Sequence, residues 1–170
     1  RRSSDLVGFN QIVNNLAKIH YRWGQNADVV VRMPTGAGVG AGPFHSQSNE
    51  AWFVKTPGLK VVYPSTPMDA KGLLIAAIND PNPVLFFEHK ALYRSIEEEI
   101  PDAMYQIEIG KAHVIQEGTD ATIITYGMGV HWAKAYQQAH PDQSIYIVDL
   151  RTLSPLDFTA IETAVKATGK

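Results

Sequence analysis

Residues 28–48, DVVVRMPTGAGVGAGPFHSQS, contain a run of β-branched residues followed by a glycine-rich loop. The run Val29–Val31 has the composition of a buried strand. Glycine then occupies every second position from 36 to 42, and the segment goes on to His45. Such a loop can follow another surface closely, because glycine adopts backbone conformations closed to other residues. His45 is a candidate for proton transfer, since histidine accepts and donates protons near neutral pH; the alternative is a turn histidine that only binds backbone.

The spacing of these glycines does not fit two familiar nucleotide-binding motifs. The third position of a dinucleotide-binding fingerprint is occupied by Ala41, and the next element does not begin directly after the glycines. No Gly-Lys-Ser or Gly-Lys-Thr follows, so a P-loop is unsupported.

Composition excludes several broad classes of protein. The chain has 170 residues, 45% of them hydrophobic, and a net charge of -2 from 15 basic and 17 acidic residues. This size allows a real core, and this charge gives no broad basic face for nucleic acid. The chain has no cysteine and no apolar run long enough for a membrane span. We expect a soluble intracellular protein, and the sequence at both ends suggests a fragment of a longer chain.

The first half of the sequence predicts alternating helices and strands. Apolar residues at helical spacing predict an amphipathic helix over 4–23 that ends at Gly24. After the glycine loop, Ser48 is the expected N-cap of a short helix through Phe53. Residues 60–63 have the composition of a buried strand.

Two segments, 66–69 and 154–157, repeat one pattern of a hydroxyl residue, a proline and a carboxylate three residues after the hydroxyl. Each follows an apolar strand and is expected to open a helix. We expect these helices to turn the following side chains inward: Leu73, Leu74, Ala77 and Ile78 in the first, and Phe158, Ile161 and Val165 in the second. Repeated strand–turn–helix units predict parallel sheets covered by helices.

The pattern is interrupted between Glu88 and Gln116, where the segment 96–102 is too charged and too interrupted for a core element. We therefore predict a first domain over 1–90, a connection with short strands over 91–116, and a second domain over 117–170. The second domain should contain a strand at 121–126, a helix at 130–139 and a strand at 144–150.

Five motifs occur in a fixed order along the chain. They are VRMP at 31–34, FHSQSNEA at 44–51, PGLKVVYP at 57–64, DPNP at 80–83 with FFE at 86–88, and DLRT at 149–152 with PLD at 155–157. Together they resemble the beta subunit of the thiamine-diphosphate-dependent decarboxylating component of 2-oxo acid dehydrogenase complexes. The resemblance covers essentially the whole chain.

This resemblance implies an α/β fold with a three-layer parallel sheet of the transketolase pyrimidine-binding type. Residues 1–90 would be the later part of that domain, 91–116 the interdomain linker, and 117–170 the start of a second α/β domain of the transketolase C-terminal type. The implied reaction is oxidative decarboxylation of a 2-oxo acid, pyruvate or a branched-chain acid, with acyl transfer to a lipoyl group.

The resemblance also implies cofactors and partners. Thiamine diphosphate with Mg²⁺ would be shared with an alpha subunit or domain in a heterotetramer, and most cofactor contacts would lie upstream of residue 1 or on the partner. The other expected partners are a lipoyl-bearing acyltransferase core and a second copy of the chain, with neither nucleic acid nor a membrane involved. The location would be the bacterial cytoplasm, or the mitochondrial matrix in a eukaryote. This segment alone would be inactive.

Particular residues acquire roles from the resemblance. His45 matches a histidine near the thiazolium end of the cofactor, with a role in proton transfer or charge stabilisation during acyl transfer to lipoamide. A monovalent cation, K⁺, would be held by five backbone carbonyls, those of Val29, Val30, Ala77, Asp80 and Asn82. The alternative at 80–83 is an ordinary Asx turn.

Several alternatives stay open. The chain could belong to another thiamine-diphosphate enzyme of the transketolase or deoxyxylulose phosphate synthase type. It could also be a non-catalytic assembly module, because Ser3 and Ser4 stand where relatives often carry an aromatic residue. Among the other polar residues, we expect Arg32 to pair with a carboxylate and Glu88 to pair with Lys90, and the remaining histidines lack the spacing of a zinc site.

Overall fold

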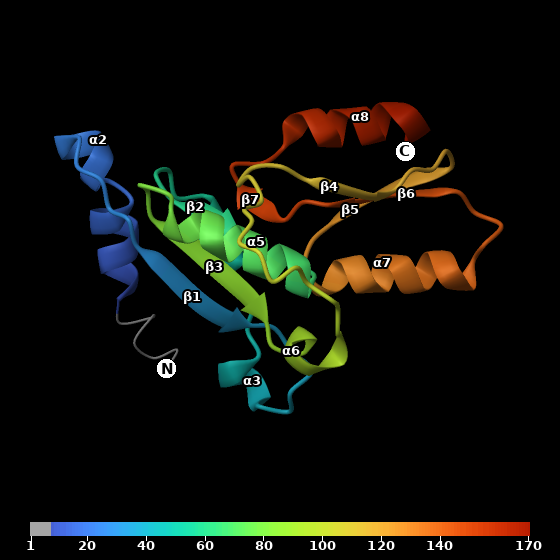
Figure 1. Cartoon of the computed structure of the whole chain (residues 1–170), viewed down its shortest axis with the longest axis horizontal. Helices are drawn as coiled ribbons and strands as arrows, with labels where there is room; N and C mark the ends of the chain where they lie inside the picture. The colour runs from blue at the N-terminus through green and yellow to red at the C-terminus, as the bar shows by residue number, and fades with distance from the viewer. Residues whose placement is uncertain (1–7) are drawn as a thin grey trace.

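The computed structural model describes residues 8–170, which form two β-sheets flanked by helices (Figure 1). Ser3, Ser4 and the first residues of the predicted helix 4–23 lie outside the described residues. The α/β architecture predicted from the sequence is confirmed, with parallel strand pairs in both sheets.

The first sheet has the strand order β1-β3-β2-β7. Strands β1 (Val30–Thr35) and β2 (Lys60–Val62) both run parallel to β3 (Val84–His89). The edge strand β7 (Thr152–Ser154) runs antiparallel to β2 and comes from the far end of the sequence. No local sequence pattern predicted this strand, which ties the second half of the chain into the first sheet.

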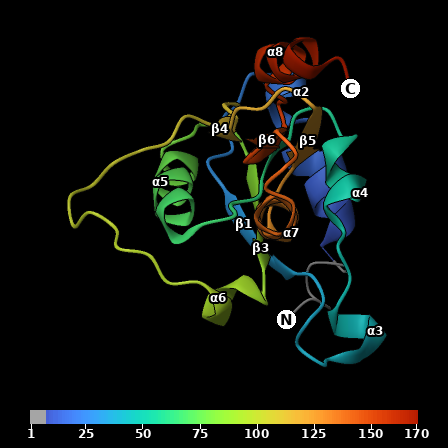
Figure 2. The same cartoon turned by 90° about the vertical axis from the view of Figure 1, so that its right-hand side faces the viewer.

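Helices cover both faces of this sheet, as Figure 2 shows. Helix α5 (Pro67–Ile78) packs on one face over Val62, Val84 and Phe86. The other face carries α4 (Glu50–Val54) and the N-terminal helical segments. The aromatic core between them includes Phe53, Tyr63 and Phe87. The chain therefore has the expected three layers, helix on sheet on helix.

The N-terminal helix is interrupted, whereas the sequence predicts one continuous helix. Residues Gln11–Leu16 are π-helical, a turn follows at 17–18, and α2 (Ile19–Trp23) ends at Gly24 with a left-handed φ of 66°. The interruption lies where Gly58 meets the helix, since a Cβ on Gly58 would come within 1.8 Å of the Ala17 carbonyl oxygen. The break in the helix thus lies at the residues against which the Gly58 backbone packs.

The second sheet has the order β4-β6-β5, with β5 (Ala121–Thr125) parallel and β4 (His113–Gln116) antiparallel to β6 (Ile145–Asp149). Helices α7 (Met128–Ala139) and α8 (Phe158–Thr168) lie on opposite faces of it (Figure 1). The strands and the helix predicted over 121–150 are confirmed. The short strand expected inside the connection is β4, and it belongs to this second sheet.

The two repeated helix-opening patterns have different outcomes. Thr66 caps α5 as predicted, with its hydroxyl accepting the Asp69 N–H at 3.1 Å. The prediction for Ser154 is wrong, because Ser154 ends β7 and its hydroxyl donates to the Leu59 carbonyl. Asp157 caps α8 instead, accepting the Ala160 N–H at 3.1 Å.

Some predicted inward positions are also wrong. Ile78, Phe158 and Val165 are exposed, whereas Ala164 is fully buried against the second sheet. The small Ala164 side chain allows α8 to approach the strands closely. The side of α8 that packs on the sheet is therefore the one that carries Ala164, next to the predicted apolar side. Leu73 and Ala77 face inward on α5 as predicted.

The connection leaves β3 through the short helix α6 (Leu92–Ser95) and then runs away from the sheets before returning at β4 (Figure 2). It is tied to α5 at a few points. The Lys71 ammonium donates to the carbonyls of residues 101–103, and the Tyr105 hydroxyl donates to the Met68 carbonyl at 2.8 Å. The first part of the connection is thus held by polar contacts to α5. Its last residues are held elsewhere, because the Gly110 N–H donates to the Thr152 hydroxyl at 3.0 Å and the Ala112 N–H donates to Asp157 at 3.2 Å.

We predict that Leu73→Ala destabilises the fold by about 2–5 kcal/mol, because it leaves a cavity in the core under α5. The matched control is Ile78→Ala on the same helix, where the side chain is 61% exposed and the expected change is within about 0.5 kcal/mol. Urea unfolding followed by circular dichroism measures both. Equal effects at the two positions would contradict the observed orientation of α5.

Candidate functional site

The glycine loop forms a closed excursion beyond the carboxyl end of β1. Its glycines at 36, 38, 40 and 42 have φ values of 84°, 88°, 64° and 66°, the left-handed region that other residues rarely adopt. The two ends of the loop meet at Gln47, whose carbonyl accepts the Gly36 N–H at 3.1 Å and the Thr35 hydroxyl at 2.7 Å. The alternating glycines are therefore required by the path of the backbone.

His45 is exposed at the end of a short helix, α3 (Gly42–His45), which the sequence analysis did not predict. The following helix α4 begins at Glu50 with Asn49 as its N-cap, so the prediction of Ser48 as the cap is wrong. The Lys90 ammonium donates to the His45 carbonyl and fixes the backbone there. The His45 side chain is thus held at the protein surface rather than within the core.

Arg32 pairs with Glu88 across neighbouring strands, which confirms the expectation that Arg32 pairs with a carboxylate. The Arg32 Nε and Nη2 atoms donate to the two Glu88 oxygens at 2.6 and 2.9 Å, and the Tyr93 hydroxyl also donates to Glu88. Arg32, rather than the expected Lys90, is the ion-pair partner observed for Glu88. This pairing follows from the register of the β1–β3 ladder. Arg32 lies opposite Phe86, and Glu88, two residues further along β3, points to the same face of the sheet within reach of the long Arg32 side chain.

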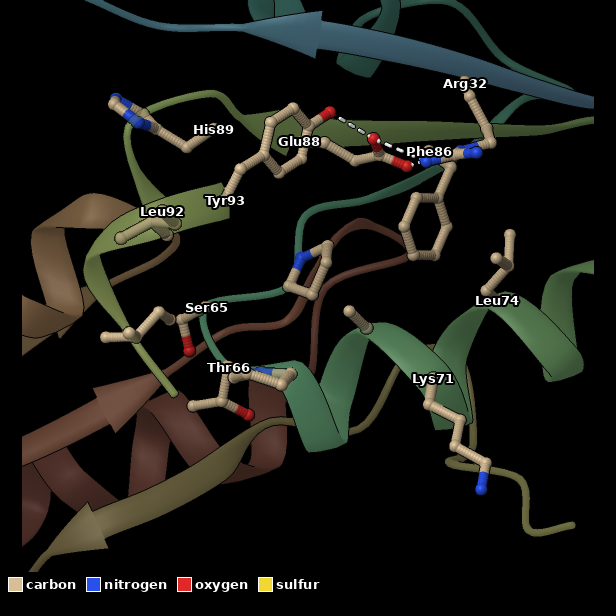
Figure 3. Close-up of a pocket in the computed structure, with 14 residues that line it drawn as sticks. Arg32, Ser65, Thr66, Lys71, Leu74, Phe86, Glu88, His89, Leu92 and Tyr93 are labelled. Atoms are coloured by element: carbon tan, nitrogen blue, oxygen red, sulfur yellow. Dashed lines mark hydrogen bonds and ion pairs between the residues drawn. The ribbon is translucent and has the colours of Figure 1, made fainter. Parts of the chain in front are cut away.

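Beside this ion pair lies a pocket of about 330 Å³ between α5, α6 and the carboxyl ends of β2 and β3 (Figure 3). The Arg32–Glu88–Tyr93 network forms one wall, and Phe86 and Leu74 form another. The remaining lining comes from Pro64, Ser65, Thr66, Pro67, Ala70, Lys71, His89, Leu92 and Ile96. The lining combines apolar side chains with two charged features, the Arg32–Glu88 ion pair and the Lys71 side chain, which is typical of small-molecule pockets.

Charged side chains are buried where the two sheets meet. Asp149 at the end of β6 accepts the Ser65 hydroxyl and the Arg151 N–H, the latter at 3.0 Å. The Arg151 guanidinium binds Asp69 in the first turn of α5 at 2.6 Å. His131 of α7 lies 2.8 Å from the Ser65 carbonyl. These contacts link the β2–α5 turn to β6, β7 and α7.

Burial dominates the titration of Asp149, which has no exposed surface. Desolvation raises its pKa to about 6, and hydrogen bonds from Ser65 and Arg151 oppose this shift. Arg151 has a left-handed φ of 55°, which is uncommon for a residue other than glycine. Its carbonyl accepts the Tyr63 N–H at 2.8 Å, so the conformation is held from the first sheet.

The five expected cation ligands lie around the carboxyl end of α5. Val29 precedes β1 and Val30 begins it, Ala77 is in the last turn of α5, and Asp80 and Asn82 follow that helix. The backbone N–H and the side-chain amide of Asn82 both donate to Asp80 Oδ1, at 2.9 and 3.0 Å, which is the Asx turn named as the alternative. The Lys60 ammonium also contacts Asp80.

This arrangement fits a cation in two respects. The carboxyl end of a helix carries partial negative charge. The carbonyls of Val29 and Ala77 each accept a backbone N–H, at 2.9 and 3.3 Å, and a carbonyl oxygen has a second lone pair. The Asx turn and a cation site are therefore compatible.

Within residues 8–170, no group of three or more histidine, cysteine, aspartate or glutamate residues has the geometry of a metal site. In the same part of the chain, no helix is both long and apolar enough to cross a membrane.

Glu50 and His89 form a further polar group, which no sequence pattern predicted. Glu50 is 7% exposed, and one of its oxygens accepts the Tyr126 hydroxyl at 3.1 Å. His89 ends β3, and its ring lies against Gly36 at the start of the glycine loop. The only sequence signal was a glutamate in the first turn of a short helix, which capping alone explains. Burial of that glutamate became visible only in the folded chain.

Known protein families and individual proteins are similar to this chain over nearly its whole length. The transketolase pyrimidine-binding domain family matches residues 6–96, and the transketolase C-terminal domain family matches residues 110–170. The chain is 53% identical to the 2-oxoisovalerate dehydrogenase subunit beta of Bacillus subtilis, over 97% of this chain and 52% of that protein. It is 47% identical to the pyruvate dehydrogenase E1 component subunit beta of the same organism, over 95% of this chain and 51% of that protein.

A solved structure described as a split gene transketolase, an inactive beta4 tetramer, shares the fold with a TM-score of 0.72 and 22% identity. The match covers 95% of this chain and 50% of the transketolase chain. The chain thus spans about half the length of the curated relatives that it matches.

We predict a stability difference between Asp149→Asn and the unchanged chain that depends on pH. A carboxyl pKa raised from 3.8 to about 6 costs roughly 3 kcal/mol above pH 6, and the cost disappears as the pH falls from 6 to 4. The unchanged chain should therefore gain stability relative to Asp149→Asn over that range. Urea unfolding at a series of pH values measures this, with the exposed Asp142→Asn as the control. A difference independent of pH would show that Asp149 titrates normally.

Proposed function

Because the chain belongs to the transketolase pyrimidine-binding domain family, we propose that it forms part of the beta-type subunit of a 2-oxo acid dehydrogenase decarboxylating component. Two relatives at 53% and 47% identity are beta subunits of 2-oxoisovalerate and pyruvate dehydrogenases. The substrate would be pyruvate or a branched-chain 2-oxo acid. The observation that carries the proposal furthest is His45, exposed at the end of a glycine loop beside the carboxyl ends of the parallel strands.

The cofactor would lie between this chain and a partner. Thiamine diphosphate, when bound, supplies the carbon nucleophile and the electron sink for loss of carbon dioxide. We assign its diphosphate and Mg²⁺ to the alpha subunit, as the family resemblance implies. The strand ends and the glycine loop of this chain support a role in closing the other side of the site, because a backbone without side chains can approach a ligand closely.

His45 would act at the acyl-transfer step. As the lipoyl dithiolane opens, one sulfur receives the acyl group and the other leaves as a thiolate that needs a proton. An exposed imidazole can donate that proton, and the Lys90 contact to the His45 carbonyl keeps the backbone in place while it does so. The lipoyl-bearing acyltransferase core is therefore the partner that we expect to meet this loop.

Two further parts of the proposal concern assembly and location. Association with an alpha subunit and with a second copy of the chain is supported by the names of the relatives and by the tetramer among the solved structures. The relatives include bacterial proteins and a mitochondrial one from Dictyostelium discoideum. We accordingly place the protein in the bacterial cytoplasm or the mitochondrial matrix.

We predict that His45→Ala in the full-length, assembled protein separates two activities. Decarboxylation of the 2-oxo acid with an artificial electron acceptor, dependent on thiamine diphosphate and Mg²⁺, should stay within about twofold. Acylation of lipoamide should fall by roughly 10²–10⁴-fold, the range of general acid–base catalysis. The control is His20→Ala on α2, also exposed but distant in sequence from the loop. Unchanged lipoamide acylation would contradict the role of His45.

We further propose that K⁺ binds at the carbonyls of Val29, Val30, Ala77, Asp80 and Asn82. Bound K⁺ should raise the Tm of the assembled protein in a saturable manner, because it binds only the folded state. Thermal unfolding in KCl and in LiCl at equal ionic strength measures this difference. A Tm that follows ionic strength alone would contradict the cation site.

A further inference from the structure

Two buried polar atoms have no hydrogen-bond partner, one on α4 after the glycine loop and one at the end of β3 against Gly36. They are Oε2 of Glu50 and Nδ1 of His89. Elsewhere in residues 8–170, the buried side-chain atoms without a partner are Asp69 Oδ2 and Arg151 Nε, which belong to one ion pair. Buried polar groups are nearly always satisfied, so an unsatisfied carboxylate oxygen and an unsatisfied imidazole nitrogen in one region call for a functional explanation.

Glu50 and His89 lie on the same face of the first sheet. Side chains alternate along β3, so His89 shares a face with Phe87, whose ring belongs to the aromatic core. Tyr63 stacks on Phe87 at 6.0 Å, and Tyr126 lies 5.1 Å from Tyr63. The Tyr126 hydroxyl in turn holds Oε1 of Glu50. His89 also lies at the edge of the pocket, where Figure 3 shows its ring pointing away from the Arg32–Glu88 pair.

The Glu50 carboxylate acts electrostatically on its neighbours. Burial raises the pKa of Tyr126 to about 12, and the charge of Glu50 adds to that shift. Burial lowers the pKa of His89, with the charge of Glu50 opposing the shift and that of Lys90 adding to it. The titratable and charged groups that face the His89 imidazole are thus Glu50 on α4 and Lys90 next in sequence, with Tyr63 and Tyr126 around the carboxylate.

His89 and Lys90 support both ends of the loop that carries His45. A Cβ on Gly36 would come within 2.3 Å of His89 Nε2, so the imidazole lies directly against the first residue of the loop. The Lys90 N–H donates to the Thr35 carbonyl at 2.9 Å, and the Lys90 ammonium donates to the His45 carbonyl. The loop therefore rests on the His89 ring at its start and on Lys90 at its end.

We propose that Glu50 and His89 form a buried carboxylate–imidazole pair that positions the His45 loop for acyl transfer. The Nδ1–H of His89 donates to Glu50 Oε2 through one water molecule, since neither atom has a direct partner, and this leaves Nε2 without a proton against Gly36. A second proton on Nε2 would press an N–H against the loop backbone. Both residues are positioning residues, and the inference rests on the proposed function, since its readout is the acyl-transfer step.

The test compares Glu50→Gln, Glu50→Asp and His89→Gln in the full-length, assembled protein. Glu50→Gln keeps an acceptor for Tyr126 but loses the charge. We expect lipoamide acylation to fall roughly tenfold, as for loss of a charged hydrogen bond, with decarboxylation to an artificial acceptor within about twofold. The acidic limb of the acylation pH profile should move to lower pH, because removing Glu50 lowers the His89 pKa. Glu50→Asp should return this acidic limb to its original pH, because it keeps the charge. His89→Gln should abolish the limb, because it removes the group that titrates.

The matched control is Glu97→Gln, an acidic residue of the exposed connection. An unchanged rate and pH profile in Glu50→Gln would overturn the pair, as would a loss of decarboxylation equal to the loss of acylation. Should Glu50→Gln fail to assemble, His89→Gln decides by the same two readouts. Failure of the proposed function is distinct, because the unchanged protein would then lack thiamine-dependent decarboxylation altogether.

Discussion

The parallel pairing of β1 with β3 determines where the Arg32–Glu88 ion pair and the support of the glycine loop lie. The ladder runs in register from Val30 opposite Val84 to Thr35 opposite His89. On one face it brings Arg32 to Glu88 beside the pocket, and on the other it ends with His89 beneath Gly36. Because side chains alternate along a strand, a slip of one residue would exchange these two faces. The loop, the ion pair and the imidazole beneath the loop thus depend on one register.

A second constraint joins the two halves of the chain. Strand β7 returns to pair with β2, and it brings Asp149 and Arg151 against the turn that opens α5. Charges at such a seam contribute little as isolated ion pairs, because desolvation offsets their attraction. These charges fix the geometry of the seam, however, since each oxygen of Asp149 accepts from a defined donor, the Ser65 hydroxyl or the Arg151 N–H. The seam also brings Tyr126 from the second sheet to Glu50, so the environment of the glycine loop depends on both sheets.

Local sequence signals predicted the elements whose causes are local. Thr66 caps α5 because its hydroxyl can reach the Asp69 N–H three residues later, a contact within one turn of the chain. The similar signal at Ser154 was overridden, because residues 152–154 gained strand pairing with β2. Ile78 and Phe158 show the same limit, since periodicity finds an apolar stripe but not the surface that it covers.

By itself, the sequence determined the α/β class, the order of most strands and helices, the glycine loop and the placing of His45 at its end. These follow from side-chain shape and backbone freedom within a few residues of one another. Only the tertiary structure decided that Arg32 binds Glu88, that Asp149 is buried beside Ser65, and that Glu50 and His89 share one face. These pairs of residues lie 39 to 84 positions apart in the sequence, and long-range pairing depends on how strands register and sheets dock rather than on any local pattern.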